Sequence, residues 1–209
     1  MLLETTYDVH ISAGTLVLML QKTSQYFGKP YKQILKEVRA APVKHADETG
    51  WRVNGINNWC WAFLKEDAVY YTIEETRGKG IPERILKNCH PNDVLVRDDY
   101  AGYKKLPFVH QSCWAHLLRE SHKEVTQKTV SEEMKQLHTK VKTLYEKLAE
   151  TIATPFVLEE RQKVYSILLQ EIQTISKKAY PATDAKRVQY RITSQNKNLL
   201  TALLYEMFL

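Results

Sequence analysis

The sequence has 209 residues and a formal net charge of +6, from 30 basic and 24 acidic side chains. It has no apolar run long enough to cross a membrane, and three cysteines are too few for a disulfide framework, so we expect a cytoplasmic protein. The positive charge permits nucleic-acid binding without requiring it.

Residues 12–41 predict helices. Ser12 can cap a helix, and apolar residues recur at helical spacing from Leu16 to Val38. Gly28 and Pro30 interrupt this pattern, so we expect two helices rather than one.

Residues 42–120 predict a mixed sheet. Asn54-Gly55 is typical of a hairpin turn, and three successive strand patterns around it predict antiparallel pairing. The short apolar run at 94–96 predicts a buried strand. The expected strands are 43–47, 59–64 (central), 68–73, 94–96 and 109–114, and the expected helices are 82–87 and 116–120.

No strand is predicted after residue 126. Apolar residues at 137–148 and 164–175 step by three and four, which predicts two long amphipathic helices, with Thr154-Pro155 at the start of the second. A third helix is expected at about 184–206. The helices of 131–178 could alternatively form a dimerisation coiled coil.

Two acidic residues stand at the ends of predicted strands. Asp47 ends the first strand and Asp98 ends the fourth. If these strands are neighbours, the carboxylates meet at one edge, where they repel each other unless a cation lies between them. Oxygen ligands of this kind suit Mg²⁺ or Mn²⁺, and a two-metal site can assist phosphodiester chemistry. Turn formation and helix capping are the alternative roles, and the pattern alone favours them.

The order of predicted elements is that of the ribonuclease-H-like fold. We therefore expect an α+β protein, with a ribonuclease-H-like mixed sheet flanked by helices and followed by an all-helical insertion region. The expected parts are an N-terminal helical segment, a catalytic core and a helical region, at 1–41, 42–120 and 121–209.

Three sequence blocks resemble transposases of the insertion sequence sixty-six family. They are residues 45–55, the stretch from Arg77 to Tyr103, and the Cys-Trp-Ala-His block within 110–119. The resemblance implies that Asp47 and Asp98 are the first two acids of a DDE triad. That triad would hold divalent metal for cleavage and strand transfer of an insertion sequence. It also implies DNA as the partner, a possible homodimer, bacterial nucleoid association and no small-molecule substrate.

The chain departs from the family pattern at two places. Asp99 stands where the family usually has Gly, and the register favours Asp98 over Asp99 as the metal ligand. The family's third acid, in an Asn-Asn-x-x-Glu-Arg context, has no counterpart, and the surroundings of Glu206 do not match it. We therefore expect a transposase core fragment that is truncated before the third acid and inactive alone. The alternative is a non-catalytic DNA- or protein-binding remnant.

Three further residues are candidates for DNA binding. His116 and Arg119 lie one turn apart on a predicted helix and could contact phosphate at the metal edge. Trp51, on an expected loop after Asp47, could stack on bases. A plain structural role is the alternative for each.

A zinc site is a poor match to the sequence. His110, Cys113 and His116 are spaced by three, with Cys89-His90 upstream, but no Cys-x-x-Cys pair accompanies them. Core packing on the last strand is the expected role of Cys113 and its neighbour Trp114.

Overall fold

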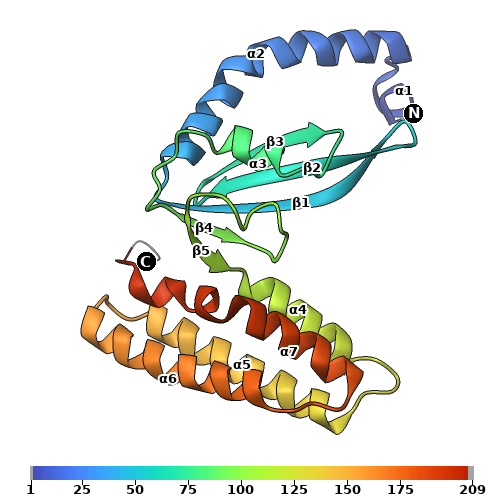
Figure 1. Ribbon diagram of the computed structural model, residues 1–209. Coiled ribbons are helices and arrows are strands. Elements are labelled where there is room, and N and C mark those ends of the chain that lie inside the picture. Colours follow the sequence, from blue (N-terminus) through green and yellow to red (C-terminus); the bar gives the residue numbers. More distant parts are fainter. Residues whose placement is uncertain (1, 207–209) are drawn as a thin grey trace.

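The computed structural model describes residues 2–206 and contains one mixed sheet, with the N-terminal helices above it and a separate group of helices below it (Figure 1). The N-terminal helices are α1 (Leu2–Tyr7) and α2 (Ala13–Ala40), and the strands are β1 (Val43–Val53), β2 (Ile56–Lys65), β3 (Ala68–Glu74), β4 (Val94–Arg97) and β5 (Val109–Ser112). The remaining helices are α3 (Gly80–Ile85), α4 (Trp114–Val125), α5 (Glu132–Ile152), α6 (Leu158–Lys177), α7 (Thr183–Gln195) and the 3-10 helices η1 (Asn196–Leu199) and η2 (Thr201–Leu204).

The five strands lie in the order β3-β2-β1-β4-β5. The first three are antiparallel neighbours, whereas β4 runs parallel to β1, and β5 runs parallel to β4. The predicted mixed sheet, the interior position of β2 and the hairpin are therefore confirmed. Asn54 and Gly55 have φ angles of 51° and 80°, which a tight hairpin turn requires.

The first strand is longer than predicted. β1 continues to Val53, so Asp47 lies within the strand rather than at its end, and Trp51 is on this strand rather than on a loop. The pairing with β2 extends to Val53↔Ile56 at the turn. Sequence patterning missed this half of β1 because its residues from Thr49 onward are exposed and carry no buried face.

The prediction that residues 12–41 form two helices was wrong. α2 is one helix with Pro30 inside it, and Figure 1 shows that it bends along its length. A proline removes one helical hydrogen bond and kinks a helix without always ending it. The C-terminal half of α2 packs on the sheet, where the ring centroids of Tyr31 on α2 and Tyr70 on β3 lie 4.7 Å apart.

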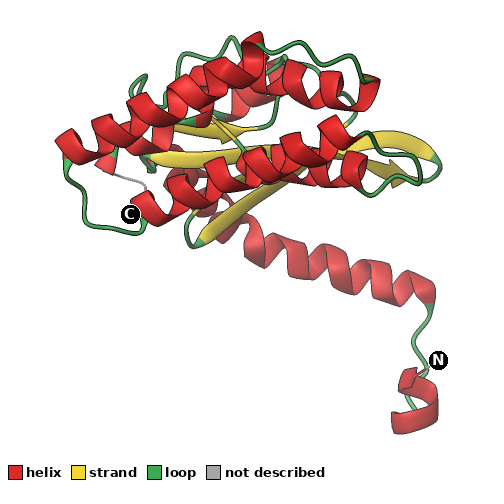
Figure 2. Cartoon of the chain, turned by 90° about the horizontal axis from the view of Figure 1, so that it is seen from below, coloured by secondary structure: helices red, strands yellow, loops and turns green. Residues whose placement is uncertain are grey.

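Two separate hydrophobic cores hold the chain. One lies between the sheet and α2, around Trp61, Phe63 and Tyr103. The other, within residues 114–203, gathers the apolar stripes of α5 and α6 with α4 and α7. The apolar faces of α5 and α6, for which a dimerisation coiled coil was the alternative, therefore pack within one chain. Figures 1 and 2 both show α1 and the start of α2 well apart from this helical region.

Several boundaries of the helical region differ from the predictions. Trp114 begins α4 instead of ending a strand, and α6 begins at Leu158 rather than at Pro155. The third long helix ends at Gln195, after which the chain continues as two short 3-10 helices. Side chains of Thr and Asn near such ends compete with regular helical hydrogen bonding, which favours this change of geometry.

The last described residues return to the sheet. Trp114 Nε1 and Gln111 Nε2 donate to the Leu199 carbonyl at 2.7 and 3.2 Å. The hydroxyl of Thr201 donates to the His110 carbonyl at 2.7 Å, and the amide of Ala202 donates to Gln111 Oε1 at 2.8 Å. These bonds attach the helical region to the edge strand β5.

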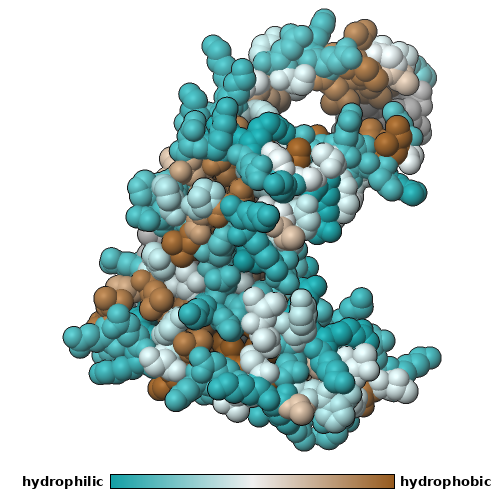
Figure 3. Space-filling model, viewed as in Figure 1, coloured by the Kyte–Doolittle hydropathy of each residue, from teal (hydrophilic) through white to brown (hydrophobic). Residues whose placement is uncertain are grey.

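The surface carries an apolar patch far from this junction. Figure 3 shows it along the N-terminal half of α2, where Val17, Leu20 and Phe27 are exposed. No helix among residues 2–206 combines the length and the apolar character that a membrane crossing requires.

Candidate metal and nucleic-acid site

The pairing of β1 with β4 brings Asp47 and Asp98 to adjacent positions. Residues pair from Val43↔Val94 to Ala46↔Arg97 in parallel. One further step in this register sets Asp47 beside Asp98, the first residue after β4. The two acids, 51 residues apart in the chain, therefore take neighbouring backbone positions at the carboxyl end of β4.

Local hydrogen bonds orient each of the two carboxylates. Asp47 Oδ1 accepts the backbone N–H of Glu48 at 3.0 Å, and the Asp47 side chain is 51% exposed. Asp98 Oδ1 accepts the N–H of Tyr100 at 2.9 Å, which closes the turn after β4. Asp98 thus forms a turn and remains partly accessible to solvent.

Asp99 has a different environment from Asp98. Lys104 Nζ lies 2.7 Å from Asp99 Oδ1, and Arg97 Nη1 lies 3.9 Å from the same oxygen. The charge of Asp99 is therefore compensated by side chains of the protein. In the β1–β4 register it is Asp98, and not Asp99, that continues the row facing Asp47.

His116, on the first turn of α4, lies beside Asp47. Its Nε2 is 3.7 Å from Asp47 Oδ2. The contact with Cys113, together with the charge of Asp47, raises the pKa of His116 above its ordinary value. Burial acts to raise the pKa of the Cys113 thiol, but His116 and the first backbone N–H groups of α4 hold it below its usual range.

The other two DNA-binding candidates lie farther from the acid pair. Arg119 is exposed one turn after His116, and its Nε donates to the Ala115 carbonyl at 3.2 Å. Trp51 is 51% exposed on β1, four residues from Asp47, which is roughly 13 Å along a strand. Of the three candidates, His116 therefore lies beside Asp47. Arg119 lies one turn further along α4, and Trp51 lies away from the acid pair.

Of the residues of the poor zinc match, Cys113 and His116 are in contact, but His110 makes its contacts elsewhere. His110 Nδ1 faces Arg97 Nε at 3.5 Å, and its Nε2 lies 3.2 Å from the Leu106 carbonyl. In the part of the chain that the structure describes, no three His, Cys, Asp or Glu side chains are grouped so as to hold a metal ion.

The donors at the acid pair nevertheless suit one type of ion. Mg²⁺ is commonly bound by one or two carboxylates and keeps several water ligands. Asp47 and Asp98 offer two hard oxygen donors at adjacent positions, and half of the Asp47 side chain is open to water. The residues present therefore fit Mg²⁺ or Mn²⁺ with water completing the coordination.

A second cluster, which sequence reasoning missed, lies one residue from Asp47. The side chain of Glu48 is fully buried and accepts hydrogen bonds from Arg77 and Tyr103. Burial raises the pKa of Glu48 above its ordinary value, although these two partners act in the opposite direction. Strand alternation could have pointed to the burial of Glu48, because Lys44 and Ala46, which lie on the same side of β1, are buried.

Cationic side chains border the turn after β4. A hollow of about 430 Å³ is lined by residues of that turn, α4 and α7. Arg187 and Arg191 pair there with Glu124 and Glu120. The lining residues are Asp99, Glu120, Thr183, Lys186, Arg187, Tyr190 and Arg191.

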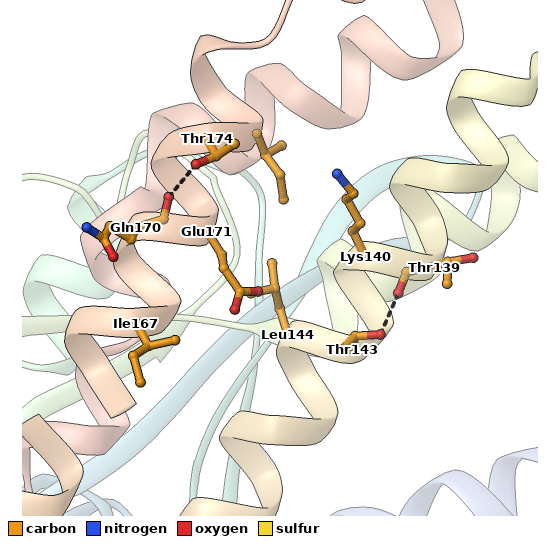
Figure 4. A pocket seen from close by; sticks show the side chains of 9 residues that line it. Thr139, Lys140, Thr143, Leu144, Ile167, Gln170, Glu171 and Thr174 are labelled. Atoms are coloured by element: carbon orange, nitrogen blue, oxygen red, sulfur yellow. Dashed lines mark hydrogen bonds between the residues drawn. The ribbon is translucent and has the colours of Figure 1, made fainter. Parts of the chain in front are cut away.

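Another hollow, of about 590 Å³, lies between α5 and α6 and has no lining residue on the sheet (Figure 4). Two of its hydroxyls are used within their own helices, because Thr143 donates to the Thr139 carbonyl and Thr174 to the Gln170 carbonyl. This hollow is therefore separate from the acid pair.

Comparison with known proteins places the chain in a family. A family model described as Transposase IS66 family matches residues 2–207. The matched range includes all five strands and all seven α-helices of the described chain, so it contains both the acid pair and the helical region. No curated protein matches the chain.

Proposed function

The chain belongs to the Transposase IS66 family, and from this premise we propose that it is a metal-binding transposase core acting on DNA phosphodiesters. We also propose that its sheet is ribonuclease-H-like. The strand order β3-β2-β1-β4-β5, with three antiparallel strands followed by two parallel ones, supports this fold. The separate core of residues 114–203 supports a helical insertion after the sheet.

One observation carries the proposal. Asp47 and Asp98 are the next residues after the pair Ala46↔Arg97 in the parallel register of β1 and β4, which gives them adjacent positions. In the proposed reaction these two carboxylates bind a divalent ion. When bound, such an ion activates a water or a 3′-hydroxyl and stabilises the leaving oxygen at phosphorus.

The surrounding residues have supporting roles in this proposal. His116, 3.7 Å from Asp47, would lie where a phosphate approaches. Arg119 on α4 and Lys186 on α7 are exposed cations of the same region and would contact the DNA backbone. Trp51 would contact DNA only beyond the site of chemistry.

The test measures metal binding and DNA cleavage in parallel. Mn²⁺ binding to the chain is titrated by electron paramagnetic resonance, and nicking of transposon-end DNA is followed in Mg²⁺ or Mn²⁺. Asp47→Asn and Asp98→Asn are expected to lose Mn²⁺ binding, whereas Asp99→Asn retains it. Binding that survives both Asp47→Asn and Asp98→Asn would overturn the proposal. Glu206→Gln tests whether this exposed residue contributes a third acid, and we expect no effect from it.

A non-catalytic role in binding DNA is the second candidate. It is favoured by the finding that no three potential ligand side chains cluster within the described residues. This role predicts DNA binding that neither metal nor Asp98→Asn changes. Strand cleavage that requires metal and both aspartates would exclude it.

A further inference from the structure

Glu48 joins the strand of Asp47 to two distant segments of the chain. Both Nε and Nη2 of Arg77 donate to Glu48 Oε1, at 2.8 and 2.7 Å. The hydroxyl of Tyr103 donates to Glu48 Oε2. Arg77 lies between β3 and α3, and Tyr103 lies in the loop after β4, so one buried carboxylate connects three segments.

Arg77 is itself held on several sides. Its guanidinium stacks over the rings of Trp59 and Tyr100, with centroids 4.9 and 4.4 Å away. The hydroxyl of Tyr100 donates to the Arg77 carbonyl. The contact between Glu48 and Arg77 therefore also fixes Tyr100.

These contacts lead directly to Asp98. The N–H of Tyr100 donates to Asp98 Oδ1 at 2.9 Å, and the rings of Tyr100 and Tyr103 meet edge to face at 5.6 Å. On the other side, the N–H of Glu48 donates to Asp47 Oδ1 at 3.0 Å. Glu48 is thus bonded to Asp47 through its backbone, and its side chain is linked to Asp98 through two tyrosines.

We propose that Glu48 is a positioning residue that sets the separation of Asp47 and Asp98 and thereby the affinity of the site for a divalent ion. This inference rests on the proposed metal-binding function. A buried carboxylate is costly unless its partners are well placed, and here it accepts from Arg77 and Tyr103 with separate oxygens. Glutamine has one acceptor oxygen and an NH₂ donor, so it cannot accept from both partners in this way.

The experiment compares Mn²⁺ affinity in the full chain carrying Glu48→Gln or Tyr103→Phe. Loss of a group that orients metal ligands typically weakens metal binding by about 10–100-fold, and we expect a loss in that range for both variants. Glu124→Gln is the matched control, because Glu124 is also a buried glutamate paired with an arginine but belongs to α4. It is expected to bind Mn²⁺ as the unmodified chain does.

The possible outcomes separate this inference from the proposed function. If the chain binds Mn²⁺ through Asp47 but Glu48→Gln and Tyr103→Phe bind it equally well, the positioning role is wrong and the proposed function stands. If the unmodified chain binds no Mn²⁺, the proposed function fails. The positioning role is then decided by hydrogen exchange at the Tyr100 amide, which donates to Asp98. We expect at least tenfold faster exchange in both variants but not in Glu124→Gln, and unchanged exchange would overturn the role.

Discussion

Replacing Arg77 by Met is expected to destabilise the chain more than an ordinary surface substitution. Arg77 is 41% exposed, but its partner Glu48 is fully buried. The substitution removes two hydrogen bonds and leaves the Glu48 carboxylate with Tyr103 as its one remaining side-chain donor among the described residues. Removing one partner of a buried ion pair costs about 3–5 kcal/mol. Because Met keeps aliphatic contact with the rings of Trp59 and Tyr100, little of this loss is attributable to packing.

A double-mutant cycle isolates the electrostatic part of this loss. In Glu48→Gln/Arg77→Met no buried charge is left, so the double variant should be more stable than the sum of single losses predicts, by about 1–3 kcal/mol. Urea unfolding followed by circular dichroism gives the free energy of unfolding for all four proteins. A loss below about 1 kcal/mol for Arg77→Met, or additive single losses, would refute this reasoning.

Two further predictions concern the helical region. Asp184 accepts the N–H and the hydroxyl of Ser131, the N-cap of α5, at 3.0 and 2.8 Å, and these bonds outweigh burial and hold the pKa of Asp184 below its usual range. Asp184→Asn should therefore lower the free energy of unfolding by about 1–2 kcal/mol above pH 4. The difference should vanish as the pH falls through the depressed pKa of Asp184 in the folded state. An equal loss in urea unfolding at pH 7 and pH 2 would contradict this prediction. Arg161, 1% exposed, donates to two carbonyls at the end of α5. Arg161→Met should lower the free energy of unfolding by about 1–3 kcal/mol. An unchanged midpoint of thermal unfolding would show that these hydrogen bonds contribute nothing to stability.

Local sequence signals predicted the parts of the fold that short segments determine. Asn54-Gly55 has the backbone angles of a hairpin turn, and the apolar run at 94–96 is a buried strand, as predicted. Asp47 and Asp98 were proposed because each follows a predicted strand pattern and lies in a block that resembles the transposase family, and β1 and β4 are indeed neighbouring strands.

Long-range contacts determined what the sequence analysis missed. The role of Glu48 depends on partners that follow it by 29 and 55 residues, and no local pattern contains them. The continuity of α2 through Pro30 likewise depends on tertiary packing, because its C-terminal half is held against the sheet by Tyr31 and Val38. The exposed end of β1 carries no burial pattern, so Asp47 was taken for the end of its strand.

The central claim is that Asp47 and Asp98 together bind a divalent cation. Its most direct test is anomalous diffraction at the manganese absorption edge from crystals soaked in Mn²⁺. We expect one or two peaks within about 2.5 Å of carboxylate oxygens from both Asp47 and Asp98. A well-diffracting soaked crystal with no peak there, or with manganese bound only elsewhere, would contradict it.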